Sequence, residues 1–363
     1  ADYGALGLGH LKMIKDGEGR NASMMMNVPR RIDGFGGRRV RSVSAGSMHS
    51  IFLMNDGAVY SCGWYVPCGL GAIDQNVYTP RQIMGQLADK RAVTVSAGDC
   101  HSLFVSDDGK CFSCGYNFAG QLGQKTENEV QQPLLIGALA DIGRVTSVSA
   151  GLEYSLFLLN DGSVYSCGEG VYGNLGIDFS DIDGADSKLF CPSRIITFDQ
   201  EECPRICAIE AGCEHSLFLA ENGIVFSCGD IHGGEEEEYV LTPTPIQALE
   251  SVRIQSITAT FTNSFFIAAD GSVYACGSNV DGSLGLGDED KRSIPQQISA
   301  LADVKIHSVS GSDNNSCFVT RSGQVFSCGN GNCGMLGHNS LDSEECIEQI
   351  PRRIESLLLR TTP

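Results

Sequence analysis

Hydrophobic and polar residues follow one pattern that recurs six times along the chain. Each copy passes from a short apolar stretch through a corner into a run such as Ser-Leu-Phe-Leu-Leu. An Asp-Gly or equivalent turn and a second apolar run such as Val-Tyr-Ser-Cys complete the copy. The copies occupy residues 43–63, 95–115, 148–168, 209–229, 257–277 and 309–329. Because Asp-Gly between β-patterned runs is the strongest short hairpin signal, each copy predicts a β-meander.

A second element, Pro-x-x-Ile, predicts a fourth strand for each copy. Proline cannot donate a hydrogen bond to a strand ladder, so it belongs on an edge strand, such as the outermost strand of a propeller blade. The element occurs at Pro29, Pro80, Pro133, Pro192, Pro243, Pro295 and Pro351. Seven outer elements therefore accompany six hairpins.

The repeat spacing of about 50 residues is typical of propellers and solenoids. The opening residues Tyr3–Gly9 match Asp281–Gly287, so the chain begins partway through a repeat. We predict an all-β fold, a seven-bladed β-propeller of four-stranded antiparallel blades with one blade incomplete at the termini. Six blades with a spare outer strand are the alternative.

This interpretation makes residues 1–363 a single propeller domain. Its repeats lie near residues 43–94, 95–147, 148–208, 209–256, 257–308 and 309–363, with 1–42 as a partial repeat.

Charge and composition narrow the function classes. The chain has 363 residues, with 25 Lys plus Arg against 44 Asp plus Glu and a formal charge of −19. Direct nucleic-acid binding is disfavoured, because a phosphate backbone is held by clustered Lys and Arg. No apolar run approaches the ~18 residues of a spanning helix, so no membrane association is expected. We expect a monomer.

Cysteines are abundant, at 16. Six of them share one strand position: Cys62, Cys114, Cys167, Cys228, Cys276 and Cys328. Equivalent positions in successive blades lie farther apart than the ~5.5 Å Cα separation of a disulfide, so these thiols should pack as small hydrophobes. Such thiol-rich usage predicts a reducing compartment, cytoplasmic or nuclear.

Two groups of residues in the sequence partly match metal-binding patterns. Cys203, Cys207, Cys213 and His215 are residue types that suit zinc, but their spacing matches no common zinc pattern. Asp181-x-Asp183-Gly184-x-Asp186 resembles a calcium loop that lacks the distal Glu. The sequence predicts no metal and no other cofactor.

The repeats resemble those of the regulator of chromosome condensation family of seven-bladed propellers. The shared motifs are AGxxHS, DG, V-Y-x-x-G, G-x-LG and P-x-x-I, and they cover essentially the whole chain. The resemblance implies either guanine nucleotide exchange on a Ran-class small GTPase or a docking platform within a larger protein. A third family role, ultraviolet reception, depends on clustered tryptophans, whereas Trp64 is the only tryptophan here.

The resemblance also implies candidate residues for exchange. The family uses an aspartate in the second corner loop, an acid in the third and a histidine in the fifth. Asp99 in Gly98-Asp99-Cys100-His101 matches the first, Glu153 is a longer acid at the second, and Asn263 departs from the third.

Histidines recur beside serine at one position of the repeat, His49, His101 and His215. Several blades carry the same pair, which favours a structural hydrogen bond over a catalytic triad. The chain also lacks a Gly-rich phosphate-binding loop with Lys followed by Ser or Thr. No hydrolytic or redox site is therefore predicted.

The corner loops differ between copies and carry acids. Asp99, Glu153, Glu214 and Asp313 should lie at one end of the blades, because loops between first and second strands emerge on the same side as loops between third and fourth strands. The candidate partner face is Asp99, His101, Glu153, Glu214, His215, Asn263 and Asp313. The acidic loops beside it contain Asp178, Asp181, Asp183, Asp186, Glu235, Glu236, Glu237 and Glu238.

A face of one charge sign selects an oppositely charged partner. The sequence therefore predicts a protein-interaction propeller that docks a basic protein. The alternative function is guanine nucleotide exchange on a Ran-class small GTPase.

Overall fold

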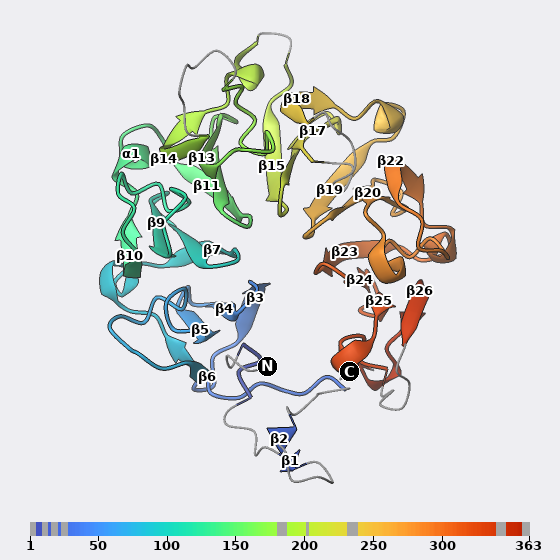
Figure 1. The fold of residues 1–363 in the computed structure, drawn as a ribbon, viewed down its shortest axis with the longest axis horizontal. Helices are drawn as coiled ribbons and strands as arrows, with labels where there is room; N and C mark the ends of the chain where they lie inside the picture. The colour runs from blue at the N-terminus through green and yellow to red at the C-terminus, as the bar shows by residue number, and fades with distance from the viewer. Residues whose placement is uncertain are drawn as a thin grey trace. The chain divides into compact units, whose positions relative to one another are not determined.

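Six four-stranded antiparallel sheets make up the computed structural model, which describes residues 5–8, 14–15, 21–22, 28–179, 187–200, 203–230, 239–338 and 346–357. Each sheet is one blade, and its strands pair in chain order, as the labels β3 to β6 show for blade 1 in Figure 1. A two-stranded ladder of β1 (Ile14–Lys15) and β2 (Asn21–Ala22) precedes the blades.

The first three blades contain the following strands. Blade 1 consists of β3 (Val40–Ala45), β4 (His49–Met54), β5 (Val59–Gly63) and β6 (Val77–Gln82). Blade 2 consists of β7 (Ala92–Ala97), β8 (His101–Ser106), β9 (Cys111–Gly115) and β10 (Val130–Leu135). Blade 3 consists of β11 (Val145–Ala150), β12 (Tyr154–Leu159), β13 (Val164–Glu169) and β14 (Lys188–Arg194).

The next three blades repeat this order. Blade 4 consists of β15 (Ile206–Ala211), β16 (His215–Ala220), β17 (Val225–Gly229) and β18 (Val240–Pro245). Blade 5 consists of β19 (Ile254–Ala259), β20 (Asn263–Ala268), β21 (Val273–Gly277) and β22 (Arg292–Gln297). Blade 6 consists of β23 (Ile306–Gly311), β24 (Asn315–Thr320), β25 (Val325–Asn330) and β26 (Ile347–Arg353).

Short helical turns link the strands. After the fourth strands come η1 (Gly85–Leu87), α1 (Gly137–Ala140), η2 (Ile196–Asp199), η3 (Gln247–Leu249), η5 (Ser299–Leu301) and η7 (Glu355–Leu357). Between third and fourth strands lie η4 (Val280–Gly282) and η6 (Asn332–Gly334).

The prediction of seven blades is wrong, and the alternative of six is correct. Six of the seven Pro-x-x-Ile prolines lie in fourth strands, but Pro29 does not lie in a strand. The first 42 residues of the sequence contain no copy of the hairpin, and among the described residues no third strand pairs with this outer element. Val43 of β3 is accordingly 56% exposed, whereas the equivalent Val148 of β11 is 6% exposed.

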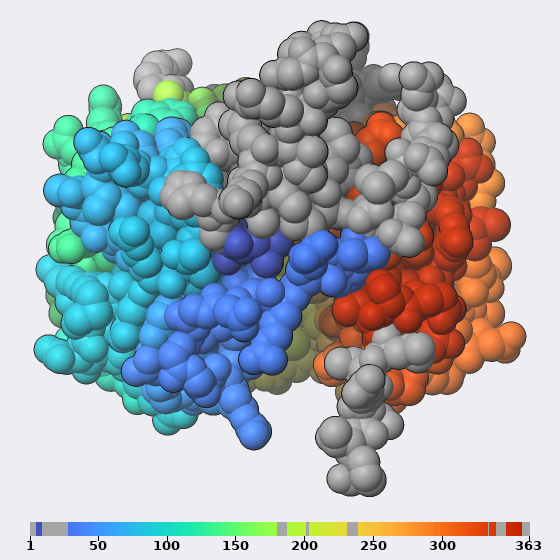
Figure 2. Space-filling view, turned by 90° about the horizontal axis from the view of Figure 1, so that it is seen from below, coloured from blue at the N-terminus to red at the C-terminus, as the bar shows by residue number. Residues whose placement is uncertain are grey.

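The segment leading into blade 1 is also at the surface. Residues 36–43, coloured blue in Figure 2, are all exposed.

The chain forms two compact units. The N-terminal unit comprises Ala1–Met24, Arg31–Val171 and Leu175–Ala211, and it holds blades 1–3 together with β15. The C-terminal unit comprises Met25–Arg30, Tyr172–Asn174 and Gly212–Pro363.

The hydrophobic core lies between neighbouring blades. In the N-terminal unit, Ile51 and Leu53 of β4 pack in one cluster with Phe104 of β8. Leu103 and Val105, whose side chains alternate with that of Phe104, pack in a second cluster toward blade 3. The alternation of a strand thus turns each middle strand into a core element for both neighbours.

The recurring cysteines are part of this interior. All six are buried reduced thiols, as the sequence predicts. Cys114 Sγ donates to the Pro67 carbonyl at 3.8 Å and Cys167 Sγ to the Gln121 carbonyl at 3.6 Å. Each thiol therefore contacts the loop of the preceding blade.

Buried histidines join neighbouring blades. Ser102 Oγ donates to the Pro67 carbonyl at 2.7 Å, so it accepts from His49 Nε2 at 2.8 Å. Ser155 Oγ likewise donates to the Gln121 carbonyl at 2.7 Å and accepts from His101 Nε2 at 2.9 Å. The histidines of blades 1 and 2 thereby bind the second strand of the next blade.

Candidate partner-binding face

In each blade, the loop between the first and second strands contacts the loop that follows the third strand in the same way. The residue after the closing glycine donates its backbone N–H to the carbonyl of the residue before the histidine position. In blade 2, Tyr116 N donates to Cys100 O at 3.0 Å, and in blade 3, Glu169 N donates to Glu153 O at 3.0 Å. The two side chains at this junction therefore leave the blade at the same end.

The closing glycine makes the junction possible. Gly115 lies opposite His101 in the ladder and has φ of 118°, which L side chains rarely adopt. A Cβ at Gly115 would sit 2.4 Å from the Cys100 carbonyl oxygen. Only glycine lets the two loops approach this closely.

We call the end of the blades formed by these junction residues and the loop residues next to them the loop face. In the N-terminal unit its pairs are Met48 with Trp64, Cys100 with Tyr116, and Glu153 with Glu169. In the C-terminal unit the pairs are Glu214 with Asp230, Thr262 with Ser278, and Asn314 with Asn330. The backbone is constant from blade to blade while the side chains change, as expected of a recognition surface built on a rigid scaffold.

Acids gather on the loop face of the N-terminal unit. Glu153 and Glu169 share a hydrogen bond, which together with burial and the charges of Glu169 and Asp99 raises the pKa of Glu153 to about 7. Lys188 Nζ lies 3.9 Å from Glu169 Oε1 and opposes this shift. We call Asp99, Glu153 and Glu169 the acidic cluster. Near neutral pH, Glu153 therefore retains its proton for part of the time.

The C-terminal unit presents acids of its own. Burial raises the pKa of Glu214, the Asp230 carboxylate raises it further, and a hydrogen bond from Tyr172 opposes the increase. Burial also raises the pKa of the exposed Asp313, and the charge of Asp281 adds to the effect. Each unit therefore presents carboxylates with a raised pKa at this end of its blades.

The other predicted face residues lie in the interior. His101, His215 and Asn263 are buried; His215 Nε2 lies 2.9 Å from Ser264 Oγ, and Asn263 Nδ2 donates to Ser283 Oγ at 3.0 Å. These side chains position the loops and do not present a surface to a partner. The candidates that reach the surface are reduced to Asp99, Glu153 and Glu214, which are half-buried, and the exposed Asp313.

The predicted acidic insertions are mostly outside the described residues. This holds for Asp181, Asp183, Asp186, Glu235, Glu236, Glu237 and Glu238, while Asp178 is described and exposed.

Sequence reasoning missed the second residue of each pair. Trp64, Tyr116 and Glu169 follow closing glycines, a position that varies between copies as much as the corner loops do. Comparing the copies at this position would have identified them. Trp64 and Tyr116 stack with ring centroids 5.1 Å apart.

No metal centre is found in the part of the chain that the structure describes, since no three His, Cys, Asp or Glu side chains there gather as ligands. No helix among the described residues is long and apolar enough to cross a membrane.

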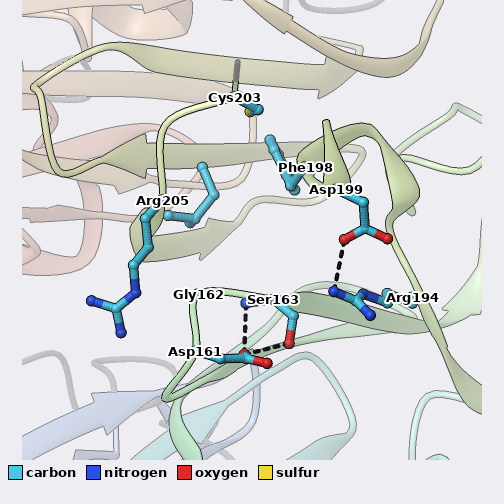
Figure 3. Close-up of a pocket in the computed structure, with 9 residues that line it drawn as sticks. Asp161, Gly162, Ser163, Arg194, Phe198, Asp199, Cys203 and Arg205 are labelled. Atoms are coloured by element: carbon cyan, nitrogen blue, oxygen red, sulfur yellow. Dashed lines mark hydrogen bonds and ion pairs between the residues drawn. The ribbon is translucent and has the colours of Figure 1, made fainter. Parts of the chain in front are cut away.

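A pocket of about 500 Å³ lies at the other end of blade 3 (Figure 3). The β12–β13 turn and the segment from β14 to β15 line it. Its carboxylates are engaged locally: Asp199 Oδ1 lies 2.8 Å from Arg194 Nη2, and Asp161 Oδ1 accepts from Ser163 N at 2.9 Å and from Ser163 Oγ at 2.6 Å. The loop face, with its unbalanced charge, is therefore the stronger candidate.

Known proteins show the same architecture. The chain is 28% identical over 336 residues to the ultraviolet-B receptor UVR8 of Arabidopsis thaliana, covering 91% of this chain and 73% of that protein. It is 32% identical over 296 residues to the human probable E3 ubiquitin-protein ligase HERC3, covering 80% of this chain but 27% of that protein. The chain thus spans about a quarter of the HERC3 length.

Solved structures agree on the fold. Prp20p of Saccharomyces cerevisiae, described with its binding properties to Gsp1p and histones, has a TM-score of 0.81 at 21% identity, covering 97% of this chain and 84% of that one. Human WBSCR16 has a TM-score of 0.77 at 21% identity, covering 92% and 86%. The model of the RCC1-like domain matches residues 1–362, and the chain belongs to this family.

Proposed function

We propose that this RCC1-like propeller is a protein-docking module whose loop face binds a basic segment of a partner protein. The acidic cluster is the observation that carries the proposal. A hydrogen bond shared with Glu169 raises the pKa of Glu153 to about 7, and burial and repulsion by the charges of Glu169 and Asp99 add to this shift. A cation placed at the face would relieve this repulsion, so the bound state is favoured electrostatically.

The charge of the whole chain supports the same partner class. A formal charge of −19 attracts cationic surfaces and repels acidic ones, which raises association rates and excludes wrong partners. The yeast relative Prp20p is named with protein partners, Gsp1p and histones. Protein docking is consistent with that relationship.

A charge-matched pair of variants tests the docking proposal. The probe is a labelled peptide of alternating lysine and glycine, titrated at low and at raised ionic strength. Glu153→Gln should weaken binding by about 5-fold at low salt. Asp141→Asn removes one exposed charge after α1, at the other end of blade 2, and should leave the affinity unchanged.

Two results would contradict docking at the loop face. One is an equal loss in Asp141→Asn and Glu153→Gln. The other is an affinity that does not fall as salt screens the charges.

Guanine nucleotide exchange is the second candidate function. Asp99 supports it, because this residue matches the family's exchange position and lies on the loop face, where its Oδ2 accepts from Cys100 Sγ at 2.7 Å. Asn263 weakens it, because the residue at the family's histidine position is buried and bonded to Ser283. Exchange would require the remaining loop-face residues to open the nucleotide site of the GTPase.

Release of a fluorescent guanine nucleotide from a Ran-class GTPase tests exchange. Acceleration that Asp99→Ala abolishes and Asp141→Ala retains would support it. No acceleration by the folded protein would leave docking alone.

A reducing compartment, cytosol or nucleus, is the proposed location. Burial raises the pKa of Cys62 and Cys276 to about 12, and all the described thiols are reduced. Alkylation before and after denaturation of protein isolated from cells should find these two thiols reduced but accessible only after unfolding.

A further inference from the structure

Four aromatic side chains form a patch on the loop face of blades 1 and 2. Trp64 stacks on Tyr116 at 5.1 Å and 30°, and the Trp64 ring meets Tyr65 edge-on at 6.4 Å. Tyr116 lies 6.4 Å from Phe118, which is 47% exposed. We call Trp64, Tyr65, Tyr116 and Phe118 the aromatic patch. The other three side chains are half-buried, so the patch retains an open surface.

The blades do not depend on this stack to stay together. The loops of blade 1 are joined by Trp64 N donating to Met48 O at 2.9 Å, and those of blade 2 by the equivalent bond of Tyr116. His49 Nε2 ties blade 1 to blade 2 through Ser102. The exposed rings therefore need a reason beyond folding, and exposed Trp and Tyr are enriched where proteins bind partners.

Carboxylates border the patch. Burial raises the pKa of Tyr116, and the charges of Glu129, Tyr65 and Cys100 raise it further. Glu129 is exposed, and the Asp99 carboxylate is bonded to Cys100. A cation bound over the rings would thus be attracted by the charges of both acids.

We infer that the aromatic patch, with Asp99 and Glu129 beside it, receives an arginine side chain of the basic partner. A guanidinium is planar and weakly hydrated, so it stacks on an aromatic face while its N–H groups reach carboxylates. An ammonium ion lacks the planar face and holds its water more strongly. This inference rests on the proposed docking function and assigns the anchoring residue of the partner.

The single tryptophan gives a direct readout. Trp64 is the only tryptophan of the chain, so its emission reports on the patch in the unmodified protein. The probes are two unlabelled peptides, one alternating arginine with glycine and the other lysine with glycine. The arginine peptide should change Trp64 emission saturably and bind more tightly than the lysine peptide.

Variants separate the patch from aromatic residues in general. Tyr116→Ala should weaken binding of the arginine peptide by about 5- to 30-fold. Phe261→Ala removes an aromatic side chain that is 40% exposed on the corner loop of blade 5, and it should have no effect. Thermal melts of both variants verify folding, and the emission of the wild-type protein is informative even if Tyr116→Ala does not fold.

The outcomes distinguish this inference from docking. In one outcome, Glu153→Gln weakens binding of the arginine peptide, while Trp64 emission does not change and Tyr116→Ala binds like wild type. This outcome would contradict the role of the aromatic patch but would be consistent with docking at the loop face. Equal affinity for the two peptides would overturn the arginine assignment. Binding of neither peptide to the folded protein would overturn docking itself.

Discussion

At the scale of single residues, the corner position and the histidine position vary together within this chain. In four copies, a glycine occupies the corner position and a residue with a ring occupies the histidine position. These pairs are Gly46 with His49, Gly98 with His101, Gly151 with Tyr154, and Gly212 with His215. The corner residue has a side chain where that position is asparagine: Thr260 with Asn263 and Ser312 with Asn315. A Cβ at Gly98 would sit 2.5 Å from His101 Cε1, so the ring requires the glycine.

Gly98→Ala should destabilise the protein by about 2–3 kcal/mol through overpacking. The same change in a His101→Asn background should cost less, because the ring is gone. Part of the cost should remain, since the new Cβ would also lie 2.5 Å from the Gly151 carbonyl oxygen. Denaturant unfolding of the four proteins in this double-mutant cycle measures the coupling. Additive costs would contradict the steric explanation.

The buried histidines should make the protein sensitive to acid. Burial lowers the pKa of His49 to about 3 and those of His101 and His215 to about 4, so each is neutral in the folded state. A lowered pKa supplies stability above the ordinary value of 6.5, and this stability is lost as pH falls toward the folded value. Urea midpoints at pH 7 and pH 5 should show His101→Asn losing about 2 kcal/mol less than wild type. Equal losses would mean that His101 is already charged at pH 5.

At the scale of elements, the hairpin turns of blades 1 to 5 are each covered by a basic residue at the start of the next blade. Arg144 Nη1 donates to the Asp108 carbonyl at 3.0 Å and Nη2 to the Asp107 carbonyl at 2.6 Å. Its stem packs on the turn glycine, where a Cβ at Gly109 would lie 2.8 Å from Arg144 Cβ. Arg91, Arg205, Arg253 and Lys305 occupy the same place over Gly57, Gly162, Gly223 and Gly271.

Arg144→Ala should cost about 1 kcal/mol of unfolding free energy, because both hydrogen bonds and the stem packing are lost. Arg144→Lys keeps the stem and should cost less. Arg41→Ala on the exposed face of β3 is the control and should be neutral. An effect of Arg144→Ala no larger than that of Arg41→Ala would show that this contact does not support the turn.

The sequence predicted the strands and turns well but did not predict which loops of different blades contact each other. Local signals sufficed for the Asp-Gly hairpins and for the edge-strand prolines, so the strands around Pro80 and Pro133 lie where expected. The count of blades failed because Pro29 repeats the local signal without a third strand beside it. The Trp64–Tyr116 stack and the Arg144 contact join different blades, and nothing local in the chain encodes which loops meet.

At the scale of the whole molecule, acidity accumulates at one end of the blades within each unit. Glu153 pairs with Glu169 in blade 3, and Glu214 pairs with Asp230 in blade 4. The two pairs occupy the same two positions of the repeat. The hairpin turns at the other end are instead covered by basic residues such as Arg144. The hairpin turns carry acids as well, but Asp56 there is paired with Arg38 and Asp108 with Lys90.

Affinity and stability should respond to pH in opposite directions. The pKa of Glu153 is raised to about 7 from 4.5, so the fold favours its neutral form, and this contribution to stability is lost as pH rises through 7. The carboxylate formed then attracts a cation. Affinity for the arginine peptide should rise by about 5-fold from pH 6 to pH 8 in wild type but not in Glu153→Gln. The same rise in both proteins would assign the dependence to another group.

Hydrogen exchange of the propeller with and without the bound arginine peptide tests the central claim most directly, because it locates the partner without any substitution. Docking at the loop face predicts slowed exchange at the corner loops around Met48, Cys100 and Glu153, with unchanged exchange at the hairpin turns around Gly57, Gly109 and Gly162. Protection of the hairpin turns in place of the corner loops would contradict the account.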